Sequence, residues 1–421
     1  MDSCLEEESI ATLFNSTGGA LFPNLRFLSW YNGRPFPLPH VAAQSLRILH
    51  LDFKHADVLE YRNILDSAAS LYPLIKRFQL IVPRQYADLD GIISGHVLRW
   101  SNLRFLDCRE VALSADAILH VSRMSTLARL AFVLSKEIPN QILPSDFSLV
   151  FSNLSWCEIT SGWLFPVAKL FARTRLPVIK ELLVRFPGSP PKQTVQLFMK
   201  TLRSTCSADT LTHLSVLSQR YLLRRLCSCD KVGSLNHSLA YDDLYPCTAF
   251  GNLRSLKVNL EQSVNLTDND LVDLASAWPH LEEFFINHDS GWHIPGGITL
   301  NGLVRLFRTC PSLRSFSILF DTPTFMCIPE GMDVSYPPRQ FDQVNLIDSP
   351  LETEMFAGVV DVFVVIGFSP RLLFAWIRSE MEVALQASET RQSWRDVDEE
   401  VKARLAVNES EVNEDQVGSP V

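Results

Sequence analysis

One short phrase recurs along this chain and limits what it can fold into. PHLEEFFI (279–286) and PSLRSFSI (311–318) both place apolar residues at their third, sixth and eighth positions. We call the first of these apolar residues the anchor, and the phrase recurs with the following anchors: Leu25, Leu46, Ile75, Leu103, Leu127, Leu154, Ile179, Leu211, Leu253, Leu281 and Leu313. The 288 residues from the first anchor to the last make ten intervals, so the average spacing is 28.8 residues. Recurrence at this spacing is typical of repeat architectures.

The phrase and the stretches between its copies predict different secondary structures. Apolar residues two apart share one side of an extended segment, so each phrase predicts a short strand. Between the phrases, apolar residues recur at every third and fourth position, which predicts helices over 56–71, 113–124, 166–175, 194–204, 266–278 and 300–309. Thr267 or Asp268 is a candidate N-cap, and Asp270 suits the positive first turn of its helix.

A strand with one apolar side and a helix with one apolar stripe must be stacked on similar units to bury those surfaces. We therefore expect an α/β leucine-rich-repeat solenoid, curved, with a parallel inner sheet and outer helices. Weaker phrases around Phe341 and Leu372 predict a twelfth and a thirteenth strand, the last one serving as a cap. The expected domains are a short N-terminal lead (1–20), the solenoid (21–350) with an insertion near 217–250, a degenerate terminal repeat and cap (351–394), and an acidic, disordered tail (395–421).

Three segments of the chain carry a family resemblance. FPNLRFLSW, LTDNDLVDLASAWPHLEEFFI and LVRLFRTCPSLRSFSI resemble the leucine-rich repeats of fungal F-box proteins. The resemblance runs from about Leu21 to Pro350 and extends through Trp376. It implies that the repeats hold a substrate, while an F-box docks on the adaptor of a cullin-type ubiquitin ligase.

The F-box itself is the point where the chain departs from that pattern. Only about twenty residues, MDSCLEEESIATLFNSTGGA, precede the first repeat phrase, and no F-box can be fitted there. We therefore expect binding to the ligase adaptor only if an F-box exists outside this chain. A ligase role is implied by analogy with the family alone.

The charge of the chain is unevenly distributed. The formal net charge is −9; the segment from Asp396 to Val421 has eight acidic and two basic residues and contributes −6, which leaves −3 for the body. The linear sequence has no basic stripe with interleaved aromatic residues, so we expect no nucleic-acid partner. The N-terminus is acidic where a secretory signal would be basic, and the apolar run 355–368 is too short to span a membrane. We expect no membrane partner and an intracellular location, cytoplasmic or nuclear.

Nine cysteines are scattered through the chain, and one group of them could suggest a metal site. Cys227 and Cys229 lie in the sequence near Cys206, His213, His237 and Cys247. The pair lacks the two-residue spacer and the second paired half that structural zinc sites use, so we expect neither a metal nor a cofactor.

Catalytic motifs are missing from the sequence. It contains no nucleophile elbow, no phosphate-binding loop, no dinucleotide fingerprint and no HExxH. The favoured hypothesis is therefore a non-enzymatic protein-protein interaction module, similar to the substrate-recognition part of an F-box protein. The alternative is an enzyme or small-molecule sensor that uses a site near the Cys-rich insertion.

The expected binding surface is the face of the strands that points away from the helices. In each phrase the residue between the second and third apolar positions must point to that face. The row formed by these residues is Ser29, His50, Gln79, Asp107, Ala131, Glu158, Leu183, Ser215, Lys257, Phe285 and Ser317. A solvated strand face would have such small and polar residues, but Leu183 and Phe285 are apolar. We expect a protein partner to bind this row with Phe285 as an anchor, together with Lys257, Leu183, Asp107, Glu158 and His50.

Overall fold

The computed structural model describes most of the repeat region and parts of the C-terminal region. The described residues are 22–31, 44–53, 65, 68, 71–82, 89–135, 148–219, 238–288, 292, 297–319, 339–346, 356–365, 368–370, 396–397 and 399–404. The chain divides into two compact units. The first contains Met1–Pro187, Ser204–Thr210 and Gln219–Asp230, and the second contains Gly188–Arg203, Leu211–Ser218 and Lys231–Val421.

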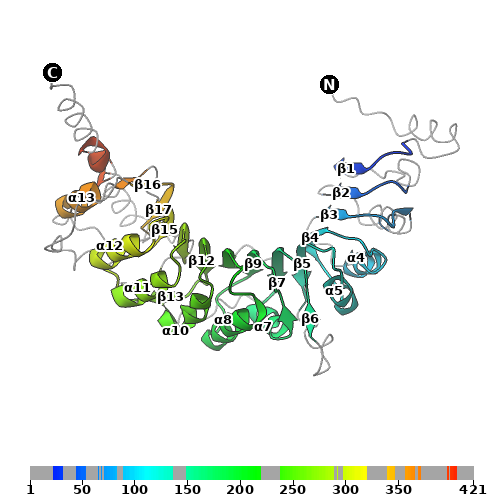
Figure 1. Ribbon diagram of the computed structural model, residues 1–421, viewed down its shortest axis with the longest axis horizontal. Coiled ribbons are helices and arrows are strands. Elements are labelled where there is room, and N and C mark those ends of the chain that lie inside the picture. The colour runs from blue at the N-terminus through cyan, green and yellow to red at the C-terminus, as the bar shows by residue number, and fades with distance from the viewer. Residues whose placement is uncertain are drawn as a thin grey trace, which may run out of the picture. The chain divides into compact units, whose positions relative to one another are not determined.

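The first unit is built on parallel strands that pair in the order of the chain (Figure 1). These strands are β1 (Phe27–Tyr31), β2 (Ile48–Asp52), β3 (Arg77–Ile81), β4 (Phe105–Ala112), β5 (Arg129–Leu134), β7 (Trp156–Ser161) and β9 (Glu181–Phe186). A separate parallel pair is formed by β6 (Leu149–Val150) and β8 (Thr174–Arg175). Every strand that is adjacent in this order is parallel to its neighbour, so the connections between them must cross over.

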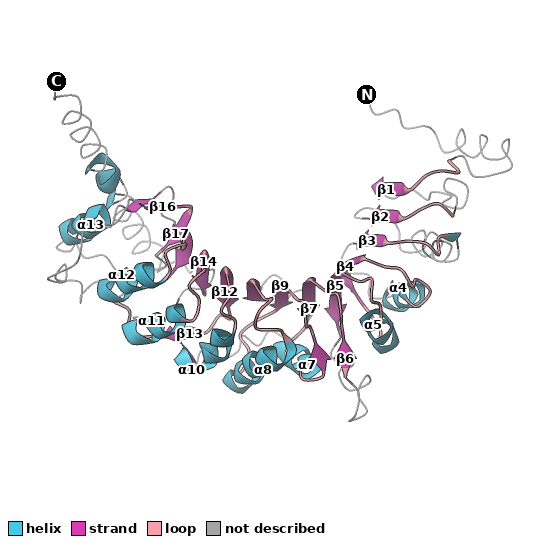
Figure 2. Cartoon of the chain, in the orientation of Figure 1, coloured by secondary structure: helices cyan, strands magenta, loops and turns pink. Residues whose placement is uncertain are grey.

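Helices supply crossovers in the first unit and lie on one side of its strands (Figure 2). They are α4 (Leu89–Val97), α5 (Ala115–Ser122) and α7 (Leu164–Phe171). Helix α5 begins after Ser114, whose hydroxyl accepts a hydrogen bond from the backbone N–H of Ala117. Its buried residues include Ile118 and Val121, so an apolar stripe faces the strands.

The second unit repeats this arrangement. Its parallel strands are β10 (His213–Ser218), β12 (Ser255–Asn259), β14 (Glu283–Ile286), β15 (Ser315–Ser317) and β17 (Gln343–Asn345). Its helices are α8 (Lys192–Thr205, of which all but the last two residues belong to this unit), α10 (Tyr241–Leu244), α11 (Asp268–Ser276), α12 (Leu300–Thr309), α13 (Phe356–Val365) and the 3-10 helix η1 (Tyr245–Ala249). Two small parallel pairs are added by β11 (Ser238–Ala240) with β13 (Ser263–Asn265), and by β16 (Arg339–Phe341) with β18 (Phe368–Pro370). The α/β class with parallel strands flanked by helices is confirmed.

The anchors of the sequence phrase fix where each strand begins. Leu103 precedes Phe105, the first residue of β4, by two positions, and Leu281 precedes Glu283, the first residue of β14, by two positions. The same offset holds for all eleven anchors and for Phe341 before β17. Every anchor after Leu25 is at most 2% exposed, so the expectation of a buried anchor is confirmed for these positions.

Most predicted helices are present, and one helix was not predicted. Helices α5, α7, α8, α11 and α12 fall within or overlap their predicted stretches, and Thr267 is the N-cap of α11 in a capping box with Asp270. The helix predicted over 56–71 lies largely outside the described residues. Helix α4 was missed because Gly91 and Gly95 weaken its helical pattern, yet a Cβ added at either glycine would meet no atom within 4 Å.

The C-terminal region corrects one expectation. Within the tail predicted to be disordered (395–421), residues 396–397 and 399–404 are helical, and residues 405–421 lie outside the described ones. Val397 and Val401, four residues apart, are both fully buried, and Arg404 lies 2.6 Å from a carboxylate oxygen of Asp361 on α13. An apolar pair on one helix face is enough to hold this segment against the protein despite its acidic composition.

Two further expectations concern the insertion and the apolar run. Helices α10 and η1 and strand β11 occupy the second half of the predicted insertion, while residues 220–237 lie outside the described ones. The apolar run 355–368 contains α13, whose residues Val359, Val360 and Phe363 are buried. Strand β18 precedes Leu372, which itself lies outside the described residues.

Within the described ranges, none of the helices combines the length and the apolar composition needed to cross a bilayer.

Candidate functional site

The predicted row of strand residues is aligned in the first unit. The Cα partners across neighbouring strands follow the predicted order, namely Ser29, His50, Gln79, Asp107, Ala131, Glu158 and Leu183. Neighbouring strands lie about 4.8 Å apart, so these side chains form a continuous line across the sheet. From His50 on, each member lies between two buried core residues, such as Leu106 and Cys108 beside Asp107.

The row continues within the second unit in the same manner. Ser215 on β10 pairs with Lys257 on β12, which pairs with Phe285 on β14 and then with Ser317 on β15. Asn345 on β17 extends the row by one residue. The strand residues before and after the row members face the core beneath the helices. The row members of the first unit and those of the second unit therefore lie on the strand face that is away from the helices.

The expectation that the row is solvated is wrong for several of its members. Asp107 and Glu158 are each 3% exposed, and Ala131 and Ser317 are fully buried. Phe285 is 3% exposed, so it is not the exposed aromatic anchor that the sequence predicted. Longer side chains from neighbouring positions cover these residues, whereas Leu183, His50 and Lys257 keep partial exposure.

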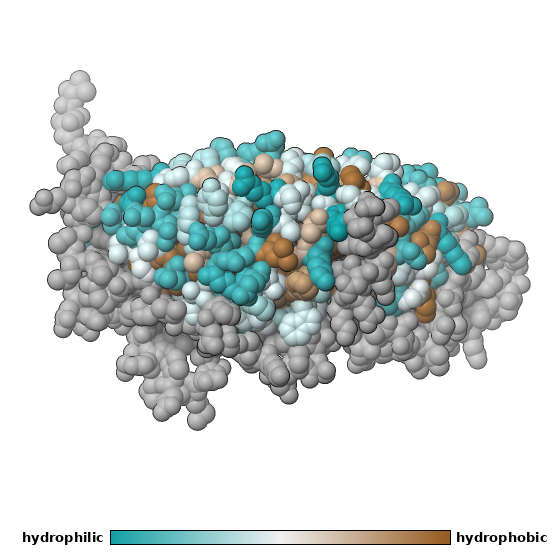
Figure 3. Space-filling model, turned by 90° about the horizontal axis from the view of Figure 1, so that it is seen from below, coloured by the Kyte–Doolittle hydropathy of each residue, from teal (hydrophilic) through white to brown (hydrophobic). Residues whose placement is uncertain are grey.

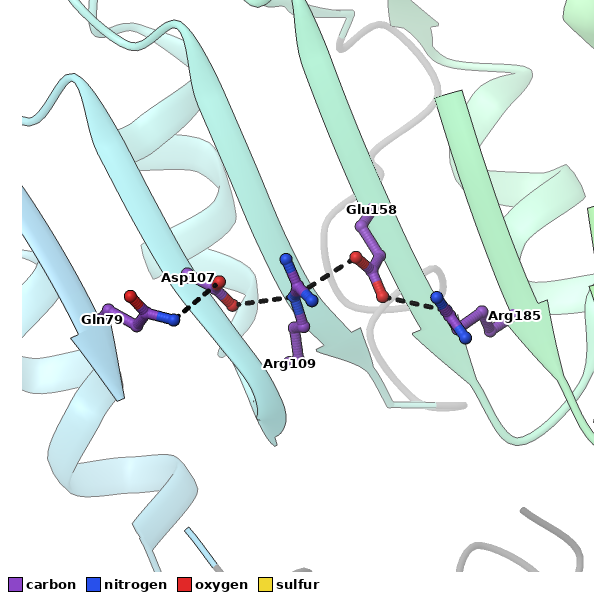
Figure 4. A network of polar contacts seen from close by, with 5 residues as sticks. All are labelled: Gln79, Asp107, Arg109, Glu158 and Arg185. Carbon is purple, nitrogen blue, oxygen red and sulfur yellow. Dashed lines mark hydrogen bonds and ion pairs between the residues drawn. The ribbon is translucent and has the colours of Figure 1, made fainter. Parts of the chain in front are cut away.

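An ionic network explains the burial of the two acidic members (Figure 4). The Nε atom of Arg109 lies 3.2 Å from a carboxylate oxygen of Asp107 and 3.2 Å from one of Glu158. The Nε atom of Arg185 lies 2.9 Å from the other oxygen of Glu158, and the Nε2 atom of Gln79 donates a 3.5 Å hydrogen bond to Asp107. The side chains of Asp107 and Glu158 are 4% exposed, and partners of opposite charge offset the cost of removing them from water.

Ala131 makes this network possible. Asp107 is on β4 and Glu158 is on β7, with β5 between them, so Arg109 must reach across β5 to contact both. The row residue of β5 at that place is Ala131, the smallest side chain of the row, and it is fully buried. A methyl group leaves the room that the guanidinium needs, and the guanidinium then covers the methyl group.

Burial shifts the pKa of two members of the predicted row, Asp107 inside the network and His50 outside it. Burial raises the pKa of Asp107 above its ordinary value, Arg109 opposes this effect, and the neighbouring Glu158 adds to it. Burial lowers the pKa of His50, with Asp52 opposing. His50 Nδ1 lies 3.2 Å from the hydroxyl of Ser29, and its ring stands edge-on to Tyr31 with centroids 5.3 Å apart.

A second row lies two residues before the predicted one and points to the same face. Its members in the first unit are Phe27, Ile48, Arg77, Phe105, Arg129, Trp156 and Glu181. The guanidinium of Arg77 lies 4.9 Å from the ring centroid of Phe105. Those of Arg109 and Arg129 lie 5.5 and 5.6 Å from the ring of Trp156. Arginine and aromatic side chains therefore alternate on this face in cation-π contacts.

The second unit has a smaller charged cluster on its strand face. Lys257 Nζ lies 2.8 Å from a carboxylate oxygen of Glu283 and 5.1 Å from the ring centroid of Phe285. The hydroxyl of Ser255 donates a 2.6 Å hydrogen bond to Glu283. Burial would raise the pKa of Glu283, but the hydrogen bonds from Lys257 and Ser255 outweigh it and leave this pKa below its ordinary value. Lys257 and the edge of His288, whose ring centroid is 5.4 Å away, cover Phe285.

Sequence reasoning found the acidic members of the network and missed their cationic partners. Arg109 and Arg185 follow Asp107 and Leu183 by two residues, and Arg77 and Arg129 precede Gln79 and Ala131 by two residues. Because side chains two residues apart share a strand face, the positions before and after the row carried the missing signal.

The cysteines that the structure describes are buried and form no disulfide with one another. They are Cys108, Cys157, Cys206, Cys247 and Cys310. Burial raises the pKa of Cys247 to about 12, and its sulfur lies 3.7 Å from that of Met199. No group of three or more potential metal ligands occurs among the described residues. The sequence's alternative site, around Cys227 and Cys229, lies outside them.

No protein-family model matches the chain. No curated protein matches it either. Its function is therefore inferred from the geometry of the strand face.

Proposed function

We propose that this chain is a protein-binding module of the leucine-rich-repeat type, whose strand face away from the helices receives the partner. The observation that carries the proposal is the aligned row of arginine and aromatic side chains in the first unit. Arginine, tryptophan and other aromatic residues are enriched where protein interfaces gain most of their binding energy. The constant two-residue offset between anchor and strand supports the repeat assignment and a curved solenoid.

The opposite side of the protein supports this choice of face. Seen from the side on which the helices lie, the described surface mixes hydrophilic, intermediate and hydrophobic residues, and the hydrophobic ones form small groups among the others (Figure 3). Scattered apolar residues are normal on a protein surface and do not indicate an interface. The strand face combines half-buried Trp156, Phe105 and Leu183 with exposed arginines, and is the better candidate.

The resemblance to fungal F-box proteins extends the proposal to a biological role. In that role the module holds a substrate for a cullin-type ubiquitin ligase, with the F-box supplied outside the residues that resemble the repeats. The binding face and the ligase role are separate parts of the proposal. A partner that binds the strand face without being ubiquitinated would support the first part and exclude the second.

Matched variants test the binding face. A partner is captured with the immobilised full chain, purified and titrated against four variants by calorimetry. Leu183→Lys changes the half-buried row in the first unit, where a lysine can extend its ammonium to water, and Leu197→Lys is the matched change on α8, where Leu197 is 38% exposed. Lys257→Glu and Lys200→Glu form the second pair, on β12 and on α8.

We expect at least one of the two strand-face changes to weaken binding tenfold or more, and both helix changes to leave the affinity within twofold. Circular dichroism melting confirms that each variant is folded. If the helix changes alone abolish binding while the folded structure is kept, the proposed face is wrong.

A further inference from the structure

The strongest charged feature outside the ionic network is a cluster of cations where the strands of the first unit begin. Arg26, Arg47, Lys76 and Arg104 each immediately precede a strand, from β1 to β4. Backbone hydrogen bonds run from the N–H of each to the carbonyl oxygen of the one before, with N···O distances of 2.9, 2.7 and 2.7 Å. These four residues therefore stand on adjacent strands, about 4.8 Å apart, with no acidic residue between them.

Two more cations extend this cluster onto the strand face. Arg77 and Arg129, the first residues of β3 and β5, are exposed. We call the six residues together the basic band, and its members are Arg26, Arg47, Lys76, Arg77, Arg104 and Arg129. It lies in a chain whose formal net charge is −9.

The basic band has no acidic partners within the described part of the molecule. No carboxylate of the described residues forms an ion pair with any of its six members, in contrast to Arg109 and Arg185 next to it. Arg47 instead donates to the backbone oxygens of Gln44 and Leu46. Like charges placed opposite each other on neighbouring strands destabilise a sheet, so this arrangement costs stability without an internal benefit.

The nearby acids do not neutralise the surface. Asp107 and Glu158 are buried beneath Arg109 and Arg185, and Asp52 is 6% exposed. At the solvent boundary the edge where β1 to β5 begin is therefore positive, and Arg77 and Arg129 extend it onto the strand face. This corrects the premise that the chain lacks a basic stripe with interleaved aromatics, because the stripe forms only when the strands are aligned.

We propose that the basic band binds an acidic, extended segment of a partner protein. This inference rests on the proposed function and adds the chemical class of the partner. From Arg26 to Arg129 the band crosses five strands, or about 19 Å, which an extended peptide of about six residues covers at 3.3 Å per residue. Arginine forks bind carboxylates in bidentate geometry, and five of the six members are arginines.

A nucleic acid fits the aromatic residues less well. Single-stranded nucleic acids bind where bases stack on open aromatic faces. The rings of Phe105 and Trp156 already carry the guanidinium groups of Arg77, Arg109 and Arg129 at 4.9 to 5.6 Å. A base would have to displace those contacts, whereas a carboxylate can bind the outer edge of each guanidinium while its contact with the ring remains.

Fluorescence anisotropy with defined probes tests this inference on the full chain. The probes are a labelled 12-residue peptide of alternating glutamate and alanine, the same peptide with glutamine in place of glutamate, and a labelled 12-nucleotide oligothymidylate. Titrations are made at 50 and 200 mM NaCl. We expect the glutamate peptide to bind more weakly at the higher salt concentration, and at least tenfold more tightly than the glutamine peptide at 50 mM.

Charge-reversal variants locate the binding. Lys76→Glu with Arg104→Glu should weaken binding of the glutamate peptide at least tenfold. The matched double change on helices, Lys169→Glu with Lys200→Glu, alters the net charge equally and should have an effect within twofold. Equal loss in both double variants, equal binding of the two peptides, or tighter binding of oligothymidylate at 200 mM overturns the inference. The proposed function would survive those results if a captured partner still depended on Leu183 or Lys257.

Discussion

Replacing Ala131 with leucine tests the account of the ionic network. The site is fully buried and lies on β5, between the strands whose Asp107 and Glu158 are joined by Arg109. A leucine adds three carbon atoms to a filled space, which costs about 1–3 kcal/mol. Displacing the half-exposed Arg109 from Glu158 costs about 0.2–1 kcal/mol more, because Arg185 still pairs with that carboxylate. We expect a total of about 1–4 kcal/mol for Ala131→Leu.

Hydrogen exchange measured by mass spectrometry over β4, β5 and β7 reports this cost locally, and does not require two-state unfolding of the whole chain. Val133→Leu, two residues further along β5 at a half-buried position, is the matched control and should change protection by less than about 0.5 kcal/mol. Introducing Ala131→Leu into an Arg109→Ala background should cost at least about 1 kcal/mol less than in the parent, because the guanidinium no longer competes for the space. Additive costs would refute the claim that Arg109 covers Ala131.

Three further predictions follow from individual sites. Leu281→Asp places an unpaired carboxylate at a fully buried anchor and should destabilise the second unit by about 3–5 kcal/mol, measured by urea unfolding. A urea midpoint equal to that of the parent protein would exclude Leu281 from the core. Thr267→Ala removes the capping box of α11 and should lower the free energy of unfolding by about 1 kcal/mol. Ser276→Ala, at the exposed end of the same helix, should lower it by less, and equal effects would argue against the cap. The raised pKa of Asp107 means that its carboxyl group binds a proton more tightly in the folded state than in the unfolded state. Its contribution to stability therefore falls as the pH rises from the ordinary aspartate pKa through the raised one. Asp107→Asn should reduce this loss of stability between pH 4 and 7, and an unchanged dependence of stability on pH would contradict the prediction.

The positions of the strands could be predicted because their determinants are local. An anchor such as Leu281 is followed by apolar residues at fixed offsets, and these alone decide which side of the segment is buried. The same holds for α12, whose predicted and observed bounds coincide at Leu300–Thr309. Alternation along one strand also placed every row residue correctly in the register of its own unit.

The exposure of the row could not be predicted in that way. Whether Ala131 or Phe285 meets solvent depends on side chains from other strands, such as Arg109 and Lys257, which lie 22 and 28 residues away in the sequence. The buried helix around Val397 and Val401 was missed for a related reason. Its acidic composition suggested disorder, but two apolar residues on one helix face decided its packing.

The basic band could not be predicted from the sequence either, and it has a consequence for function. Its cations Arg26, Arg47, Lys76 and Arg104 are 21, 29 and 28 residues apart, so the sequence does not show them as one cluster. Parallel pairing places them on adjacent strands, where a spacing of one repeat becomes about 4.8 Å. In a stacked parallel sheet, a charge pattern at the repeat period therefore becomes a surface pattern. The net charge of −9 describes the chain, but a partner that binds this strand face meets the local excess of arginine and lysine.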